Sequence, residues 1–240
     1  MKKSFVKGQR RHDDGIRYKH DLGQHFLYDT DLLRELVAST GVQPTDRVLE
    51  IGPGAGTLTA CLCEAAERVV AVEVDDAVLP FLRVATEPYS NLEIVSGDIR
   101  RLELKALTRS LGHDFLVIAN IPYNITTPIF ELFWGSALPV KQLSVMIQKE
   151  VAEKLVAQPK DDAYCLTSVK AQYYCEPSIV AEVPASAFTP PPKVDSAFVN
   201  LPFRRAPIAP VADEALFLHI VQAGFALRGE TLVTALKGVT

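Results

Sequence analysis

The sequence predicts an α/β protein built on a largely parallel sheet. Three observations support this prediction: apolar runs of strand length alternate with helical stretches, a glycine-rich loop directly follows one of these runs, and turn residues separate the segments. Parallel strands require crossover connections, and the helical stretches supply them. The expected strands span 48–51, 69–74, 92–95, 115–119 and 143–148, and the expected helices span 57–66, 76–86, 103–111, 127–134 and 149–157.

Further segments precede and follow this alternating core. Apolar residues recur at helical spacing up to Val37, so we expect a helix that begins near Asp29 or Thr30. The late runs 178–183 and 196–201 have no long helix between them, which predicts an antiparallel addition to the sheet.

The chain divides into a basic arm at 1–21, a main domain at 22–205 and a short helical region at 206–240. In the last region Asp213 is placed to cap a helix, and a shorter helix is expected beyond Gly229. About thirty residues cannot bury an independent core, so this region either packs on the main domain or begins something longer.

The composition is that of a folded cytoplasmic protein. With 240 residues and 48% hydrophobic content, the chain can bury a full α/β core. No apolar run approaches the roughly 20 residues of a membrane span, and no hydrophobic segment follows the basic N-terminus as in a signal peptide. The four cysteines show neither disulfide nor metal-ligand spacing. We expect a monomer that binds neither a membrane nor a metal.

Positive charge is concentrated in the arm at 1–21, although the whole chain carries a net charge of −4. Such an arm would neutralise phosphates and lose affinity as salt rises. A solvated tail explains the same charges equally well. The basic residues are Lys2, Lys3, Lys7, Arg10, Arg11, Arg17 and Lys19.

A nucleotide-binding turn is expected where the first predicted strand of the sheet ends. The run 48–51 leads into Gly52-Pro53-Gly54-Ala55-Gly56, and Thr57 is placed to cap the helix that follows. Gly52 and Gly54 would let the backbone approach a ligand closely.

Polar side chains stand at the ends of the next three strands. Glu73 ends the second, where an acid would meet ribose hydroxyls, and Asp98 follows the third, where it would accept a hydrogen bond from an adenine amine. A dinucleotide enzyme shares these features, but the loop lacks the G-x-x-G continuation that seats a pyrophosphate. With Asn120 after the fourth strand, the order suits an adenosine cofactor such as S-adenosylmethionine.

The stretch Asn120-Ile121-Pro122-Tyr123-Asn124 predicts chemistry on a flat nitrogen base. The exocyclic amine of adenine is a poor nucleophile, so a catalyst must accept hydrogen bonds from both amine hydrogens. The Asn120 oxygen and a carbonyl at Ile121 or Pro122 can do this. Pro122 fixes the chain direction, and Tyr123 offers a face for an unstacked base. An Asn-Pro turn beside a core tyrosine is the alternative interpretation.

The loop 188–196 is expected to complete the base pocket. Its three consecutive prolines hold the chain extended, so that Phe188 would be presented rigidly as a second wall. An anchoring core role for Phe188 is the alternative, and it is favoured when the loop is considered alone.

Six segments, taken together and in order, resemble the ribosomal RNA adenine dimethyltransferases over about residues 17–236. The last two resemble the bacterial small-subunit enzymes, which act on two adjacent adenosines near the 3′ end of 16S rRNA, more than the macrolide-resistance enzymes of the large subunit. The segments are Gly23-Gln24-His25-Phe26-Leu27, Glu50-Ile51-Gly52-Pro53-Gly54-Ala55-Gly56, Gly97-Asp98, Asn120-Ile121-Pro122-Tyr123-Asn124, Gln148-Lys149-Glu150-Val151-Ala152 and 188–196.

The resemblance implies a Rossmann-like, S-adenosylmethionine-dependent methyltransferase sheet in a catalytic domain at 22–205, with a small C-terminal helical region. It implies dimethylation of small-subunit rRNA in the pre-30S particle. The cofactor-binding residues would be His25, Leu27, Gly52, Gly54, Glu73, Asp98 and Asn120, and the base-holding residues would be Asn120, Pro122, Tyr123 and Phe188.

The chain departs from the family's pattern at two places. The family usually has asparagine where this chain has His25, although imidazole also donates a hydrogen bond. A basic Arg-Arg-Lys-Thr run is replaced by Arg228-Gly229-Glu230-Thr231, which removes positive charge where RNA would lie. The chain also stops at Thr240, short of the helices usual in the family, so we expect a truncated chain or a reduced homologue.

Three other functions share part of the pattern. A large-subunit (23S) rRNA methyltransferase of the macrolide-resistance type is the nearest. A catalytically weak ribosome-assembly factor is motivated by the two departures, but the intact Asn120 loop disfavours it. A nicotinamide dehydrogenase is disfavoured by the incomplete glycine pattern.

Overall fold

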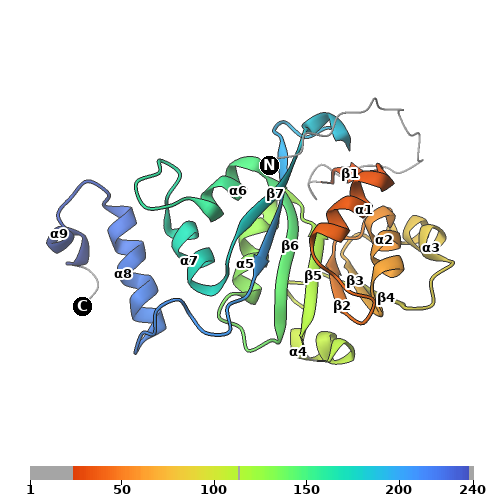
Figure 1. Ribbon diagram of the computed structural model, residues 1–240, viewed down its shortest axis with the longest axis horizontal. Helices are drawn as coiled ribbons and strands as arrows, with labels where there is room; N and C mark the ends of the chain where they lie inside the picture. The colour runs from red at the N-terminus through yellow and green to blue at the C-terminus, as the bar shows by residue number, and fades with distance from the viewer. Residues whose placement is uncertain (1–23, 113, 238–240) are drawn as a thin grey trace.

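A seven-stranded mixed sheet forms the centre of the protein, seen in a computed structural model that describes residues 24–112 and 114–237 (Figure 1). The strand order is β4-β3-β2-β5-β6-β9-β7, and β1 pairs with β8 in a separate two-stranded sheet. The arm predicted at 1–21 lies outside the described residues. The strands are β1 (Phe26–Leu27), β2 (Arg47–Ile51), β3 (Arg68–Glu73), β4 (Leu92–Ser96), β5 (Phe115–Asn120), β6 (Val140–Gln148), β7 (Ser178–Val183), β8 (Phe188–Thr189) and β9 (Ser196–Pro202).

The five strands β2 to β6 are parallel, as predicted. From β2 the chain first adds β3 and β4 on one side and then β5 and β6 on the other. A crevice opens outside the carboxyl ends of the strands where such a sheet reverses direction, here between β2 and β5. The predicted antiparallel addition is confirmed, because β9 runs antiparallel to both β6 and β7.

Helices cover both faces of the sheet. Successive side chains of a strand point to opposite faces, so each face has its own hydrophobic cluster against its own helices. Leu49 lies in the cluster with Phe130 of α5, whereas Val48 lies in the cluster with Leu62 of α2. No helix in the described ranges is long and apolar enough to cross a membrane. The helices are α1 (Thr30–Ser39), α2 (Thr57–Ala65), α3 (Leu79–Thr86), α4 (Leu104–Leu107), α5 (Thr126–Phe133), α6 (Lys149–Val156), α7 (Leu166–Tyr174), α8 (Glu214–Ala226) and α9 (Leu232–Leu236).

The starts of α2 and α3 differ from the predictions. Thr57 is the first residue of α2 and not its cap; Gly56 takes the cap position with a φ of 91°, a left-handed conformation that favours glycine. The helix α3 begins at Leu79 and not at 76. The Asp75 side chain accepts a hydrogen bond from the Ala77 backbone N–H at 3.0 Å, which holds this segment in a turn.

The helix predicted over 103–111 is shorter than expected. It consists of α4 and a 3₁₀ turn over Thr108–Leu111. The Thr108 hydroxyl donates to the Leu104 carbonyl at 2.7 Å, and Gly112 ends the segment with a φ of 68°. Four residues of α-helix cannot build the cooperative ladder that a longer helix has.

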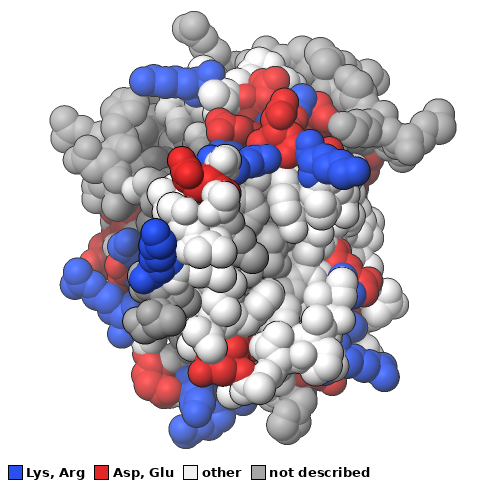
Figure 2. Space-filling model, turned by 90° about the vertical axis from the view of Figure 1, so that its left-hand side faces the viewer, with Lys and Arg blue, Asp and Glu red and all other residues white. Residues whose placement is uncertain are grey.

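The helix α8 packs on α7 at one end of the molecule (Figure 1). Asp213 caps it as predicted, and Phe217 lies with its ring 5.2 Å from that of Tyr173. On its outer side Leu216 and Ile220 are exposed. Figure 2 shows this end of the molecule, where uncharged side chains occupy the middle and charged side chains of both signs lie around them.

Replacing Asn91 with alanine should lower the free energy of unfolding by about 1–2 kcal/mol, because two helix-end carbonyls then lose their partner. Asn91 Nδ2 donates to the carbonyls of Cys63 and Ala66 at the end of α2, both at 3.0 Å. Urea denaturation measures the change. The control is Gln158→Ala, which removes an exposed amide that donates to the Val156 carbonyl. Water can replace this donor, so we expect the free energy of unfolding to fall by less than about 0.5 kcal/mol. Equal losses would contradict this account.

Candidate functional site

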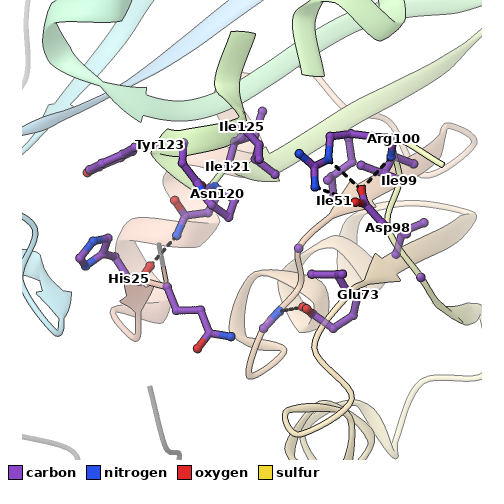
Figure 3. Close-up of a pocket in the computed structure, with 18 of the residues that line it drawn as sticks. His25, Ile51, Glu73, Asp98, Ile99, Arg100, Asn120, Ile121, Tyr123 and Ile125 are labelled. Carbon is purple, nitrogen blue, oxygen red and sulfur yellow. Dashed lines mark hydrogen bonds and ion pairs between the residues drawn. The ribbon is translucent and has the colours of Figure 1, made fainter. Parts of the chain in front are cut away.

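A cavity of about 210 Å³ lies at the carboxyl ends of β2, β3, β4 and β5 (Figure 3). The structure brings most of the predicted site residues to this one place. Among the described residues, no group of three or more His, Cys, Asp or Glu side chains is arranged to hold a metal ion. The predicted residues that line the cavity are His25, Gly52, Gly54, Glu73, Asp98, Asn120, Pro122 and Tyr123.

The glycine loop and Glu73 hold one another in place. The Gly54 N–H donates to Glu73 Oε2 at 3.0 Å, and the Asp75 N–H donates to Oε1 at 2.8 Å. Burial raises the pKa of Glu73, and the two backbone donors oppose this rise. A side chain at position 54 would overlap the ring of Phe26, so only glycine lets the loop approach this segment. The loop and the acid are therefore positioned together before any ligand binds.

Asp98 is bound by an arginine that the sequence analysis missed. Arg100 donates from Nη2 to Asp98 Oδ2 at 2.6 Å and from Nε to Oδ1 at 2.9 Å, and its backbone N–H also reaches Oδ1 at 3.0 Å. This pairing lowers the pKa of Asp98 and keeps the carboxylate ionised. Oδ1 already accepts two hydrogen bonds, so Oδ2 has the remaining capacity to accept from a ligand. The only signal in the sequence was an arginine two residues after the acid.

The Asn120 carboxamide has a defined orientation. Its Nδ2 donates to the backbone carbonyl of His25 at 3.0 Å. Since a carbonyl only accepts, the amide nitrogen must face His25 and Oδ1 is turned toward the cavity (Figure 3). The loop after Asn120 is held by its own backbone, because the Ile121 N–H donates to Met146 and the Pro122 carbonyl accepts from Ile125. An acceptor for an amine is thus fixed at the end of β5.

His25 and Tyr123 form one side of the cavity. Their ring centroids are 5.6 Å apart with an interplanar angle of 30°. His25 Nδ1 lies 2.7 Å from the Pro190 carbonyl, which assigns the proton to Nδ1 because the carbonyl cannot donate. The Tyr123 hydroxyl lies 2.6 Å from Ser196 Oγ, and burial raises the pKa of Tyr123, so the phenol stays neutral.

Two predicted site residues do not line the cavity. Phe188 is 2% exposed and Leu27 is 5% exposed, and both belong to the hydrophobic cluster under α1 and α2. They face one another where β8 pairs with β1, and this pairing turns both side chains into the core. The structure thus places Phe188 in a core position and outside the cavity lining, and its role as a second wall of the base pocket stays a prediction.

Glu50 is a buried carboxyl group next to the cavity. It is 1% exposed, and neither of its carboxyl oxygens has a hydrogen-bond partner in the described structure. Burial raises its pKa to about 8. Gly52 and Asn120 line both the main cavity and the smaller space that Glu50 adjoins. Glu50 is therefore a neutral acid at the base of the site below about pH 8.

The raised pKa of Glu50 makes folding stability depend on pH. The folded protein holds a proton that the unfolded chain releases near pH 4.5, so the stabilisation is complete below pH 4.5 and is lost as pH rises toward 8. In Glu50→Gln the amide stays neutral, so between pH 5 and pH 8 the free energy of unfolding of the wild type should fall by about 3–4 kcal/mol relative to that of the variant. Denaturant curves at several pH values measure this. Parallel pH profiles for the two proteins would show that Glu50 does not titrate in this range.

Comparison with protein families identifies the chain. The family model for ribosomal RNA adenine dimethylase matches residues 15–240. The chain belongs to the ribosomal RNA adenine dimethylase family. As a member of the dimethylase family it is a methyltransferase, and the predicted resemblance is confirmed.

Two relatives in this family carry the name ribosomal RNA small subunit methyltransferase A. The protein from Bacillus licheniformis is 39% identical over 221 residues, which cover 91% of this chain and 76% of the relative. The protein from Alkaliphilus metalliredigens is 40% identical over 224 residues, which cover 92% of this chain and 78% of the relative.

Solved structures confirm the predicted methyltransferase fold. A dimethyladenosine transferase from Plasmodium falciparum superposes with a TM-score of 0.77 at 28% identity, over 89% of this chain and 75% of the other. The 23S rRNA methyltransferase ErmE superposes with a TM-score of 0.71 at 27% identity, over 88% of this chain and 83% of the other.

Proposed function

We propose that this protein dimethylates the exocyclic amines of two adjacent adenosines near the 3′ end of 16S rRNA, as a cytoplasmic enzyme acting on the pre-30S particle with S-adenosylmethionine as methyl donor. One observation carries the proposal: Asn120 Oδ1 is fixed as an acceptor in the same cavity as the glycine loop and Glu73. The names of relatives at 39–40% identity support the small subunit as the target.

The residues of the cavity fit an adenosine cofactor. Glu73 would accept from ribose hydroxyls, and Asp98 Oδ2 would accept from the adenine amine. Ile51 and Ile99 line the same cavity and provide apolar surface for a flat base. When bound, S-adenosylmethionine supplies an electrophilic methyl group.

The Asn120 loop would orient the nucleophile. Asn120 Oδ1 and a backbone carbonyl of the same loop accept the two amine hydrogens of the target adenine, which turns the nitrogen lone pair out of the ring plane. Tyr123 offers its neutral ring as a surface for the unstacked base. These groups work by holding the amine in line with the methyl group and not as strong bases.

Replacing Asn120 with alanine should slow methyl transfer by about 100-fold, because an oriented acceptor is lost where charge develops. The dissociation constant of S-adenosylmethionine should rise by a smaller factor than the rate falls, because Glu73 and Asp98 still bind the cofactor. Asn120→Asp keeps an acceptor but places an oxygen against the His25 carbonyl, so we expect it to be slow as well. Single-turnover rates and calorimetry measure the two effects. An unchanged rate in Asn120→Ala would rule out the role assigned to this residue.

Replacing Glu73 with glutamine should weaken S-adenosylmethionine binding by about tenfold, because the amide nitrogen cannot accept from both backbone donors and from the ribose. Calorimetry with the cofactor alone measures this. The control is Glu93→Gln on the neighbouring strand β4, which removes an exposed carboxylate that pairs with Arg68. Equal affinities for the Glu73→Gln and Glu93→Gln proteins would contradict the assignment.

The function is tested by offering labelled S-adenosylmethionine with undermethylated small subunits and, in parallel, with naked large-subunit RNA. Mass spectrometry identifies the modified nucleoside. Dimethyladenosine in the small subunit alone is the expected result. Label in large-subunit RNA would move the protein to the macrolide-resistance type, and cofactor binding without transfer to either RNA would favour an assembly factor.

A further inference from the structure

Ser196 reaches the site because of the direction of its strand. The strands β2 to β5 end at the cavity and β6 runs parallel to them, whereas β9 runs antiparallel to β6 and therefore begins at the same edge of the sheet, beside Tyr123. Ser196 is the first residue of β9 and pairs with Gln148 on β6 and with Val183 on β7. It is fully buried, with 0% exposure. A polar side chain in such a position requires a hydrogen-bond partner.

That partner is Tyr123. The two hydroxyl oxygens are 2.6 Å apart, and the Ser196 side chain has no other hydrogen-bond partner among the described residues. Tyr123 is the first residue of a short 3₁₀ turn over Tyr123–Ile125. Its hydroxyl lies at the far end of the ring from the backbone. A hydrogen bond at that distant end restricts the tilt of the whole ring.

A second contact from the 188–196 segment, made through His25, supports the Tyr123 ring from the side. The His25 imidazole lies next to the Tyr123 ring (Figure 3), and the Pro190 carbonyl holds His25 Nδ1 at 2.7 Å. The 188–196 segment thus supports this wall at two points, through the Pro190 carbonyl and the Ser196 hydroxyl. Its aromatic residue Phe188 is buried elsewhere in the core.

We propose that Ser196 is a positioning residue that holds the Tyr123 ring in the plane on which the target adenine stacks. The inference rests on the proposed function, because it assigns the wall of the substrate pocket. Stacking requires two rings to stay parallel, and a ring that is free to rotate must lose that freedom in every turnover. The hydrogen bond to Ser196 restricts the ring before the base arrives.

A double-mutant cycle tests the proposal. Ser196→Ala and Tyr123→Phe remove the same hydrogen bond from opposite ends, and each should slow single-turnover methylation of undermethylated small subunits by about tenfold. The double variant should be no slower than Tyr123→Phe alone. The dissociation constant of S-adenosylmethionine should stay close to the wild-type value, and the melting temperature of each single variant should fall by a few degrees because a buried hydroxyl loses its partner.

The matched control is Ser144→Ala. Ser144 is also buried in the sheet, on β6, where its hydroxyl accepts from Gln142 Nε2 at 2.6 Å. We expect this variant to methylate at the wild-type rate. Multiplicative losses in the double variant, or an equal loss in Ser144→Ala, would overturn the proposal.

A spectroscopic measurement separates this proposal from the proposed function. In protein labelled with ¹³Cζ-tyrosine, the signal missing from Tyr123→Phe identifies Tyr123, and Ser196→Ala should shift it while Ser144→Ala should not. If the wild type methylates neither RNA, the proposed function fails. An unshifted Tyr123 signal in Ser196→Ala refutes the positioning role whatever the activity.

Discussion

The order of the site depends on the hydrogen bond from Asn120 Nδ2 to the His25 carbonyl. This bond sets which end of the carboxamide faces the cavity, and it ties the first described segment of the chain to the end of β5. The same segment pairs with β8 and places Phe26 against Gly54. The Asn120 hydrogen bond, the pairing with β8 and the contact of Phe26 with Gly54 therefore hold this segment at the strand ends. His25 and Phe26 of the segment line the cavity.

Three carboxyl groups near the cavity have different protonation behaviour because their surroundings differ. Glu50 has no partner and is kept neutral by burial, whereas Asp98 is kept ionised by the guanidinium of Arg100. Glu73 lies between these extremes, because burial and two backbone donors act on it in opposite directions. The cavity thus presents Glu73 and Asp98 to a ligand as acceptors in different surroundings, while Glu50 stays buried beside it.

The sequence predicted the parts of the site that local patterns encode. Apolar runs located the strand ends, and the carboxyl ends of parallel strands meet at one edge, so Asn120 was expected in the right place. The burial of Leu27 and Phe188 against one another was not predicted, because the pairing of β1 with β8 joins segments far apart in the sequence and no local pattern specifies it. Arg100 and Ser196 were missed because their importance lies in side-chain geometry and not in residue spacing.

The position of β9 in the sheet determines when the site is completed during synthesis. β9 lies between β6 and β7, and within the seven-stranded sheet β7 pairs with β9 alone. When the nascent chain has emerged only as far as β7, this strand has no partner in the sheet, because β9 has not yet been synthesised. The strands β2 to β6 are already available at that stage. The strands that carry the glycine loop, Glu73 and Asn120 can therefore assemble first. Tyr123 gains its partner only after the ribosome has delivered β9, so this wall is the last part of the cavity to form.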